Sequence, residues 1–266
     1  MFFTADNGSV GMELWKTDGT AAGTVLVKDI WTGTNWANIS KLTDVAGLLY
    51  FVANDGVNGE ELWQSDGTTA GTSMVADLNA TGIDQLTNVN GKLFYRASGE
   101  LWSRNSSAVT PSMVKELGEG GWEGAPLSLT AVGSTLFFTA VYAWATPGPK
   151  VSIGRELWKS DGTAAGTVLV KDLVDIPVST YNDYAWGSSP VNLVNNNGTL
   201  FFSANDGVNG QELWMSDGTT AGTTLFTDLT SDSGSSDPQN ITAIGGRLYL
   251  TAMSEAKGRE PLTVID

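Results

Sequence analysis

The sequence predicts an all-β protein of the β-propeller class, and three observations lead to this prediction. A segment of twelve residues, Glu13–Thr24, returns almost unchanged at Glu61–Thr72, Glu156–Thr167 and Glu212–Thr223. Around each copy, short segments rich in β-branched and aromatic residues alternate with Gly, Asn and Asp, and none shows the apolar spacing of a helix. Repeats of about 45 residues with four short strands each are typical of propeller blades.

The repeat between residues 192 and 229 shows the four expected strands most clearly. A short apolar segment, Asn192–Val194, precedes the turn dipeptide Asn197–Gly198 and a run of strand formers, Leu200–Ala204. A third strand, Glu212–Ser216, is followed through an Asp-Gly-Thr turn by a fourth, Thr223–Leu229. We name these the inner, second, third and outer strands of a blade.

The number of blades depends on how the two ends are counted. Two degenerate copies of the repeat begin at Glu100 and Glu260. With these copies included, the sequence contains six second and six third strands but five inner and five outer strands. Six blades with incomplete terminal blades are favoured. In the alternative, five blades close when the last inner strand completes the first blade, which leaves residues 247–266 over. The repeats run without a break in composition, so we expect a single domain over residues 1–266.

The repeated pattern Glu-Leu-Trp-x-x-Asp-Gly-Thr resembles that of the bacterial ELWxxDGT-repeat proteins, and the resemblance covers nearly all 266 residues. The resemblance implies a repeat β-propeller. It implies no particular activity.

The repeated residues are expected to be structural, because a catalytic site needs one constellation and these occur four to six times. The tryptophans of the motif are expected to fill the wedge between blades: Trp15, Trp63, Trp102, Trp158 and Trp214. The glutamates are expected to accept hydrogen bonds from the backbone, since a buried carboxylate must be paired. The turn aspartates are expected to bind local amides, in a role that resembles the Asp-box of sialidase propellers: Asp18, Asp66, Asp161 and Asp217.

Composition excludes several classes of function. The 29 acidic and 14 basic residues give a formal net charge of -15, which disfavours binding to nucleic acid or to anionic lipid. The sequence contains no Cys and no His, so thiolate metal sites and Ser-His-Asp triads are excluded. No run approaches the roughly 18 apolar residues of a membrane-spanning helix, so we expect no membrane insertion.

The start of the chain, Met1–Ala5, has the composition of the middle of a repeat and lacks a basic-then-apolar signal segment. We expect a secreted or cell-surface protein whose export signal lies outside this chain.

The loops 54–59 and 205–210 share the sequence Asn-Asp-Gly-Val-Asn-Gly, and their oxygen-bearing side chains suit Ca2+. The candidate metal ligands are Asp55, Asn58, Asp206 and Asn209. The spacing lacks the full pattern of an EF-hand, and both dipeptides are ordinary turn formers. We therefore expect no cofactor, with Ca2+ as the alternative.

Aromatic residues outside the motif gather in the irregular connections. Those between an outer strand and the next inner strand are Ile30–Asn38, Gly118–Pro126 and Val174–Pro190, and an insertion, Val141–Gly154, separates a second from a third strand. The candidate ligand-binding residues in these segments are Trp31, Trp36, Trp122, Tyr142, Trp144, Tyr181, Tyr184 and Trp186. In an antiparallel blade both classes of connection emerge at the same end, so these residues are expected to form one binding face.

We predict a non-catalytic extracellular binding propeller that presents this aromatic face to a glycan or another surface polymer. The alternative is a structural or adhesive module of a larger bacterial surface protein, which self-associates through its incomplete blades. A third alternative is an enzyme similar to glycoside hydrolases, which use two carboxylates. The loops contain candidate carboxylates that no spacing ties together: Glu119, Glu123, Asp175 and Asp183.

Overall fold

The computed structural model describes residues 1–78, 80–105, 110–117, 125–144, 151–174, 187–230, 234–254 and 258–265. Over these residues the protein is all-β, with twenty-two strands in six antiparallel sheets, and none of them forms a helix long and apolar enough to cross a membrane. The predicted fold class is therefore confirmed. Contacts group the chain into two compact units, Met1–Met113 and Val114–Asp266, and each is described by itself.

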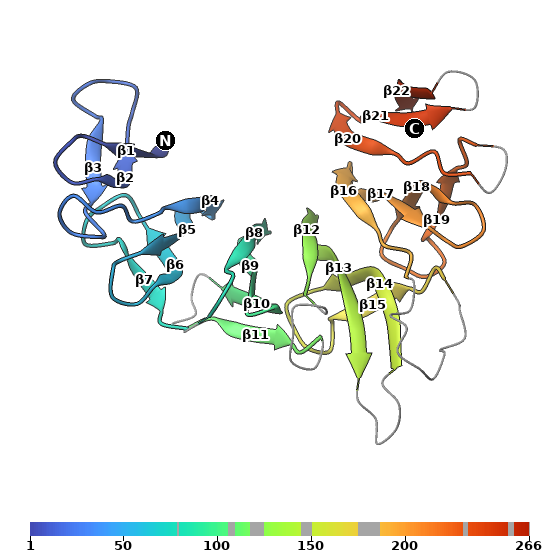
Figure 1. Cartoon of the computed structure of the whole chain (residues 1–266), viewed down its shortest axis with the longest axis horizontal. Coiled ribbons are helices and arrows are strands. Elements are labelled where there is room, and N and C mark those ends of the chain that lie inside the picture. Colours follow the sequence, from blue (N-terminus) through green and yellow to red (C-terminus); the bar gives the residue numbers. More distant parts are fainter. Residues whose placement is uncertain are drawn as a thin grey trace. The chain divides into compact units, whose positions relative to one another are not determined.

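The first three sheets, blades 1 to 3, follow one another from the N-terminus (Figure 1). Blade 1 consists of β1 (Phe2–Asp6), β2 (Met12–Lys16) and β3 (Val25–Lys28). Blade 2 consists of β4 (Ser40–Val45), β5 (Leu48–Asn54), β6 (Glu60–Ser65) and β7 (Ser73–Ala76). Blade 3 consists of β8 (Asp84–Val89), β9 (Lys92–Ala97), β10 (Glu100–Asn105) and β11 (Ser112–Lys115).

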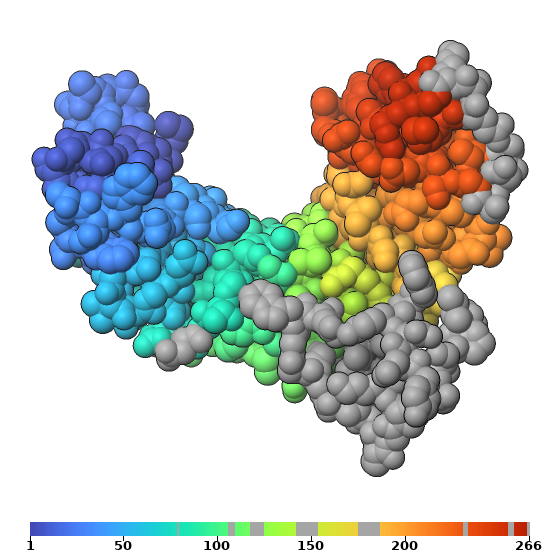
Figure 2. Space-filling view, viewed as in Figure 1, coloured from blue at the N-terminus to red at the C-terminus, as the bar shows by residue number. Residues whose placement is uncertain are grey.

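The last three sheets, blades 4 to 6, form successive bands from yellow-green to red, each in contact with the next (Figure 2). Blade 4 consists of β12 (Leu127–Val132), β13 (Thr135–Trp144), β14 (Val151–Ser160) and β15 (Val168–Lys171). Blade 5 consists of β16 (Val191–Asn196), β17 (Thr199–Asn205), β18 (Gln211–Ser216) and β19 (Thr224–Thr227). Blade 6 consists of β20 (Gln239–Ile244), β21 (Arg247–Ser254) and β22 (Gly258–Ile265).

The strands of each blade lie side by side in chain order, as inner, second, third and outer strands. Within the described residues, blade 1 lacks an inner strand and blade 6 lacks an outer strand. The last inner strand, β20, pairs with β21 in a sheet of its own. The described residues therefore form six sheets, as the favoured six-blade count predicts, and residues 247–265 are not left over but pair with β20 and with one another.

Of the motif tryptophans, Trp63, Trp102 and Trp214 pack against the preceding blade, as predicted from their place in the strand. Trp63 of blade 2 packs with Leu14 and Val27 of blade 1. Trp214 of blade 5 packs with Leu157 and Val170 of blade 4 in the same way. Because successive residues of a strand point to opposite faces, the neighbouring leucine faces the next blade instead, as Leu62 does towards blade 3 and Leu213 towards blade 6.

Blades 1 and 2 are also joined by polar contacts between their outer parts. The Nζ atom of Lys28 donates a hydrogen bond to the carbonyl oxygen of Thr72, at 2.7 Å. In the opposite direction, the Oγ1 atom of Thr69 donates to the carbonyl oxygen of Val27, at 2.8 Å. A lysine in one blade and a threonine in the next therefore define this joint.

Blades 4 and 5 repeat this joint. Lys171 Nζ donates to the Thr223 carbonyl oxygen at 2.8 Å, and Thr220 Oγ1 donates to the Val170 carbonyl oxygen at 2.9 Å. The sequence explains the match, because blades 1 and 4 share Val-Leu-Val-Lys in the outer strand, and blades 2 and 5 share Thr-Thr-Ala in the turn. The chain thus contains one two-blade arrangement twice, which we name the first module (β1–β7) and the second module (β12–β19).

Each Asp-Gly-Thr turn closes on its own aspartate. Asp66 Oδ1 accepts hydrogen bonds from the Thr68 backbone N–H (2.8 Å) and hydroxyl (2.7 Å), and these bonds lower the pKa of Asp66. A Cβ atom at Gly71 would overlap the Asp66 carboxylate, so this position requires glycine. The other turn aspartates make equivalent bonds: Asp18 to Thr20, Asp161 to Thr163 and Asp217 to Thr219. The predicted role of these aspartates is confirmed.

A bulge occurs at the second residue of each of the five inner strands in the described chain. At this point the register shifts, and the residue adopts a left-handed conformation with φ between 53° and 59°. The five residues are Lys41, Gln85, Ser128, Asn192 and Asn240. None is glycine, although glycine would adopt this conformation at the lowest cost.

Candidate binding face

Two classes of connection emerge at the same end of every blade, because the strands are antiparallel and in chain order. One class joins second to third strands, and the other joins an outer strand to the next inner strand. We name this end of each blade its loop face.

A buried glutamate accepts hydrogen bonds from the backbone of the connection that joins the outer strand of blade 1 to the inner strand of blade 2. Glu13 of β2 is fully buried, and its carboxylate accepts hydrogen bonds from the backbone N–H groups of Ile30 (2.7 Å) and Trp31 (3.3 Å). Burial raises the pKa of Glu13 to about 7, although these hydrogen bonds act in the opposite direction. The connection that carries Trp31 and Trp36 is therefore fixed to the body of the blade.

The equivalent glutamates in the second unit act in the same way. Glu156 accepts from the Ser188 N–H (2.6 Å) and hydroxyl (2.5 Å), and burial raises its pKa to about 7. Glu212 accepts from the Ser236 N–H (2.7 Å) and hydroxyl (2.5 Å). The predicted pairing of these carboxylates with the backbone is confirmed.

The loop 54–59 between β5 and β6 forms a rigid tip around Asp55. Its Oδ1 atom accepts from the N–H groups of Val57 (2.9 Å) and Asn58 (2.8 Å), and Oδ2 accepts from Asn58 Nδ2 (2.7 Å). Burial raises the pKa of Asp55, but the hydrogen bonds together outweigh it and lower the pKa. The loop therefore holds its shape through its own side chains, and Val57 projects from it with 85 % of its surface exposed.

The four candidate calcium ligands lie on this tip and on its counterpart, the loop 205–210. Asp206 receives the same three hydrogen bonds from Val208 and Asn209 that Asp55 receives in the first tip. Within the described residues, no three or more acidic side chains come together in a group that could hold a metal ion. Both oxygens of each aspartate accept hydrogen bonds within the loop, and calcium binding stays a prediction.

Trp36 and Val57 lie on adjacent connections of the loop face in the first module. The Ala37 carbonyl oxygen accepts a hydrogen bond from the Asn54 N–H at 2.8 Å, which joins the two connections at their bases. The ring of Trp31 covers Gly56, where a Cβ atom would overlap the indole. Trp36 itself is 57 % exposed. We name Trp31, Trp36, Val57 and Asn58 the first patch.

The other aromatic candidates are placed only in part. Trp122, Tyr181, Tyr184 and Trp186 lie outside the described residues, as do the candidate carboxylates Glu119, Glu123, Asp175 and Asp183. Tyr142 and Trp144 belong to β13, and the backbone of Trp144 is paired with Val151 of β14.

The insertion Val141–Gly154 was expected to be an irregular loop, and this expectation is wrong for its two ends. Residues 141–144 extend β13, and residues 151–154 extend β14, so the hairpin strands reach ten residues each. Aromatic and β-branched residues in both segments favour a strand. Of the eight aromatic candidates, the described residues place Trp31 and Trp36 on one connection of the loop face.

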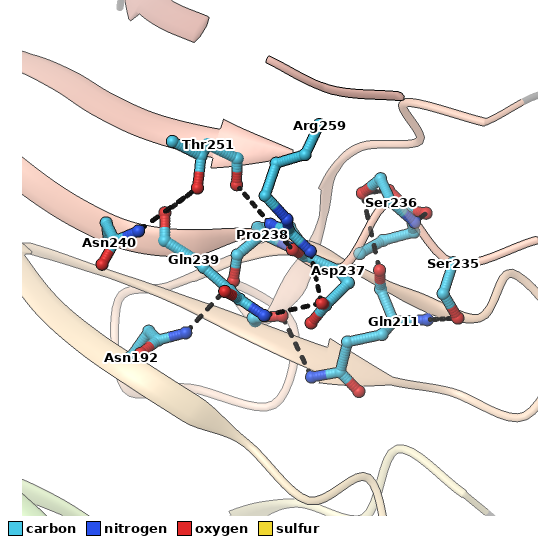
Figure 3. Close-up of polar contacts among 12 residues, drawn as sticks. Asn192, Gln211, Ser235, Ser236, Asp237, Pro238, Gln239, Asn240, Thr251 and Arg259 are labelled. Carbon is cyan, nitrogen blue, oxygen red and sulfur yellow. Dashed lines mark hydrogen bonds and ion pairs between the residues drawn. The ribbon is translucent and has the colours of Figure 1, made fainter. Parts of the chain in front are cut away.

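A polar network on blades 5 and 6 was not predicted (Figure 3). Arg259 of β22 forms an ion pair with Asp237 (Nη2 to Oδ2, 2.6 Å), and its Nη1 donates to the Asp237 carbonyl oxygen at 2.9 Å. Gln239 Nε2 donates to the same Asp237 carboxylate at 2.7 Å, and Asn192 Nδ2 of blade 5 donates to the Pro238 carbonyl oxygen at 3.1 Å. The network fixes the connection where it joins β20.

A signal for this network was present in the sequence. An arginine directly precedes the motif glutamate in blades 4 and 6. Arg155 Nη1 donates to the carbonyl oxygens of Ala125 and Thr139, both at 3.0 Å, just as Arg259 donates to those of Asp237 and Thr251. This arginine therefore clamps the start of the inner strand to the second strand. The network is a structural element of the loop face.

Comparisons with known proteins bear on the fold. No protein-family model and no curated protein matches the chain. Among solved structures, the chain is similar to a puromycin hydrolase S511A mutant complexed with PGG, at 11 % identity and a TM-score of 0.52, over 99 % of this chain and 41 % of that one. A puromycin-hydrolyzing peptidase of Mycobacterium tuberculosis gives 11 % identity and a TM-score of 0.49, over 95 % and 41 % of the two chains.

A putative TolB from Agrobacterium tumefaciens gives 9 % identity and a TM-score of 0.41, over 99 % of this chain and 77 % of that one. The chain spans about two fifths of the length of the two puromycin-hydrolysing proteins. At these identities the likeness concerns the fold alone. With six antiparallel sheets in chain order, the chain is a β-propeller protein.

Proposed function

We propose that the protein is a non-catalytic binding propeller, secreted or displayed at the cell surface, whose loop face binds a carbohydrate polymer. The observation that carries this proposal is the first patch, where Trp36 (57 % exposed) and Val57 (85 % exposed) lie on adjacent connections. Binding modules commonly combine a rigid scaffold with exposed loop residues.

The rigidity of both connections supports a role in binding. Glu13 fixes the connection that bears Trp36, and Asp55 fixes the tip that bears Val57. A ligand that covers these side chains gains about 25 cal/mol for each Å² of apolar surface removed from water. It also avoids the entropy cost of ordering a mobile loop.

The chemistry of the patch suits a sugar ring. An indole stacks on the C–H face of a pyranose, and the amide of Asn58 beside Val57 offers polar atoms to hydroxyl groups. The net charge of -15 disfavours acidic polymers, so a neutral glycan fits best.

A glycan array tests this proposal, with the wild-type protein compared with W36A and V57D. The matched control is Val25→Asp in β3, which alters an exposed valine of blade 1 outside the loop face. We expect binding to a neutral glycan that W36A and V57D each weaken at least about tenfold, equivalent to 1.4 kcal/mol. A blank array, or a glycan bound equally well by all variants, would overturn the proposal.

A second candidate function, a self-associating structural module, is favoured by the exposed face of blade 6. Ile244 is 62 % exposed and Tyr249 is exposed beside it, whereas the equivalent residues of blade 2, Val45 and Tyr50, are buried. Sedimentation velocity over a wide concentration range tests it. Self-association should weaken in Ile244→Asp, and a monomer at all concentrations would exclude this function.

A further inference from the structure

We propose that Glu13 and Asp29 of blade 1 form a proton-controlled switch for the connection that carries the two aromatic residues of the first patch. With one proton on the pair the connection stays closed, and when both carboxylates are ionised the segment 31–36 opens. The opening is a property of the chain itself. Its consequence for the first patch, weaker binding of a glycan at higher pH, rests on the proposed function.

The two carboxylates hold the start of this connection through its backbone. The N–H groups of Ile30 and Trp31 donate to the Glu13 carboxylate at 2.7 and 3.3 Å. The Gly33 N–H donates to Asp29 Oδ2 at 3.3 Å. Glu13 is fully buried, so its charge is not solvated by water. The charge state of two acidic side chains therefore acts directly on three backbone hydrogen bonds of one short segment.

Asp29 has a buried oxygen atom that lacks a donor. Its Oδ1 atom has no hydrogen-bond partner among the residues that the structure describes, and an unpaired carboxylate oxygen in the interior is costly. Burial, and to a lesser degree the negative charge of Asp29, raises the pKa of Glu13 to about 7. A proton on Glu13 removes one of two like charges and gives the pair a donor that it otherwise lacks.

The other charged groups on the elements around Glu13 have different partners or face solvent. Within the described residues these groups are Asp6 on β1, Lys16 on β2, Lys28 on β3, Asp55 in the tip, and Glu60 and Glu61 on β6. Both lysines donate to carbonyl oxygens of blade 2, Asp55 accepts hydrogen bonds within its own loop, and Glu61 accepts from its own connection. Asp6 and Glu60 are exposed. Asp29 is the charged group that acts on Glu13.

Blade 1 lacks a hydroxyl group that the equivalent connections of blades 4 and 5 provide. Ser188 and Ser236 lie four residues before the bulge of the next inner strand, and each donates both its N–H and its hydroxyl to the buried glutamate. Ala37 lies at the same distance before Lys41. A hydroxyl donates to an ionised carboxylate, so those two connections keep a side-chain bond when the proton leaves. The connection of blade 1 has no such bond from this position.

The switch acts over a defined pH range. In the open state Glu13 meets water and its pKa returns towards the ordinary value of 4.5, whereas the pKa in the closed state is about 7. The closed state therefore binds the proton more tightly, and the stabilisation is complete below pH 4.5 and is lost as the pH rises to about 7. The open population rises by up to about tenfold per pH unit over this range.

Hydrogen exchange of the full chain between pH 5 and pH 8 measures the opening, with rates corrected for the intrinsic pH dependence of exchange. Peptides that cover residues 30–37 report on the connection. Glu13→Gln is neutral at every pH, and Ala37→Ser installs the serine of blades 4 and 5. The control is Glu60→Gln, which changes an exposed glutamate. Thermal unfolding checks that each variant is folded.

In the wild type and in E60Q, corrected protection of residues 30–37 should fall by up to about tenfold per pH unit between pH 5 and 7. E13Q should show no such fall, and A37S should keep more protection than the wild type at pH 8. Equal pH dependence in the wild type and E13Q would overturn the proposal. So would a folded A37S that loses protection as the wild type does.

The binding consequence has its own measurement. The affinity for a glycan found on the array should fall between pH 5 and pH 8 in the wild type and stay constant in E13Q. A blank array would overturn the proposed function, and the exchange data would still decide whether the switch exists.

Discussion

Lys28 of blade 1 and Thr72 of blade 2 are joined by a hydrogen bond of 2.7 Å from Nζ to the carbonyl oxygen. The same ammonium group lies 5.9 Å from the centre of the Trp63 ring. One side chain thus satisfies a carbonyl of the next blade and adds a cation–π contact in the wedge between the blades.

Replacing Lys28 by methionine should destabilise the protein by about 1.5–3 kcal/mol, because a charge-assisted hydrogen bond is lost from a partly buried joint. Urea unfolding measures the effect. Lys41→Met, which changes an exposed lysine, is the control and should cost less than about 0.5 kcal/mol. Equal losses in the two variants would show that the joint contributes nothing specific.

Gly71 and Asp66 should be coupled, since a Cβ atom at Gly71 would overlap the Asp66 carboxylate. We expect Gly71→Ala to cost about 1–3 kcal/mol through this overlap. In a chain that carries Asp66→Gly, the same change should cost clearly less. A double-mutant cycle in urea provides the measurement, and strictly additive effects would contradict the proposed overlap.

The buried glutamates should make stability depend on pH. Burial raises the pKa of Glu156 from its ordinary value of 4.5 to about 7 in the folded protein. The folded state therefore binds a proton more tightly than the unfolded state, so this group's contribution to stability is complete below pH 4.5 and is lost as the pH rises to about 7.

Glu156→Gln removes this titration. Between pH 5 and 7 the stability of the wild type should fall relative to that of E156Q by up to about 1.4 kcal/mol per pH unit. Urea unfolding at several pH values measures the difference, with the exposed Glu60→Gln as a control for overall charge. Parallel curves for the wild type and E156Q would disprove the assignment.

Removal of calcium should leave the protein unchanged. Both carboxylate oxygens of Asp55 accept hydrogen bonds within the loop, so the loop holds its shape without a metal ion. We expect the same Tm in calcium and in chelator, and a small loss of stability in Asp55→Asn under both conditions. A rise in Tm with calcium that Asp55→Asn abolishes would establish a metal site instead.

The repeated part of the fold could be predicted from the sequence because its pattern is local. A strand alternates between its two faces, so the position of Trp63 two residues after Glu61 was enough to place both on one face. Residues that recur in each copy of the repeat could then be assigned structural roles, and residues that occur once were the candidates for a binding site. Trp63, Glu13 and Asp66 have the roles that this reasoning gave them.

The candidate site was harder to predict, because it depends on residues that occur once and on contacts between segments far apart in sequence. Nothing local to Trp36 shows that its connection lies beside the tip bearing Val57. Glycine is needed at position 71 because the Asp66 carboxylate lies where a Cβ atom would be, and this contact is visible only in the folded turn. The sequence of the loop around Val57 points to oxygen ligands for a metal ion, and nothing in it shows that the valine projects into solvent.

The bulges of the inner strands have a consequence for the behaviour of the protein in solution. Each inner strand is the first in its sheet, so one side of its backbone is not paired within that sheet. A regular edge of this kind is a template on which other chains can add strands and aggregate. The left-handed residue near the start of each inner strand, such as Ser128 in β12, interrupts the regular ladder. We expect this interruption of the ladder to limit edge-to-edge aggregation of the protein in solution.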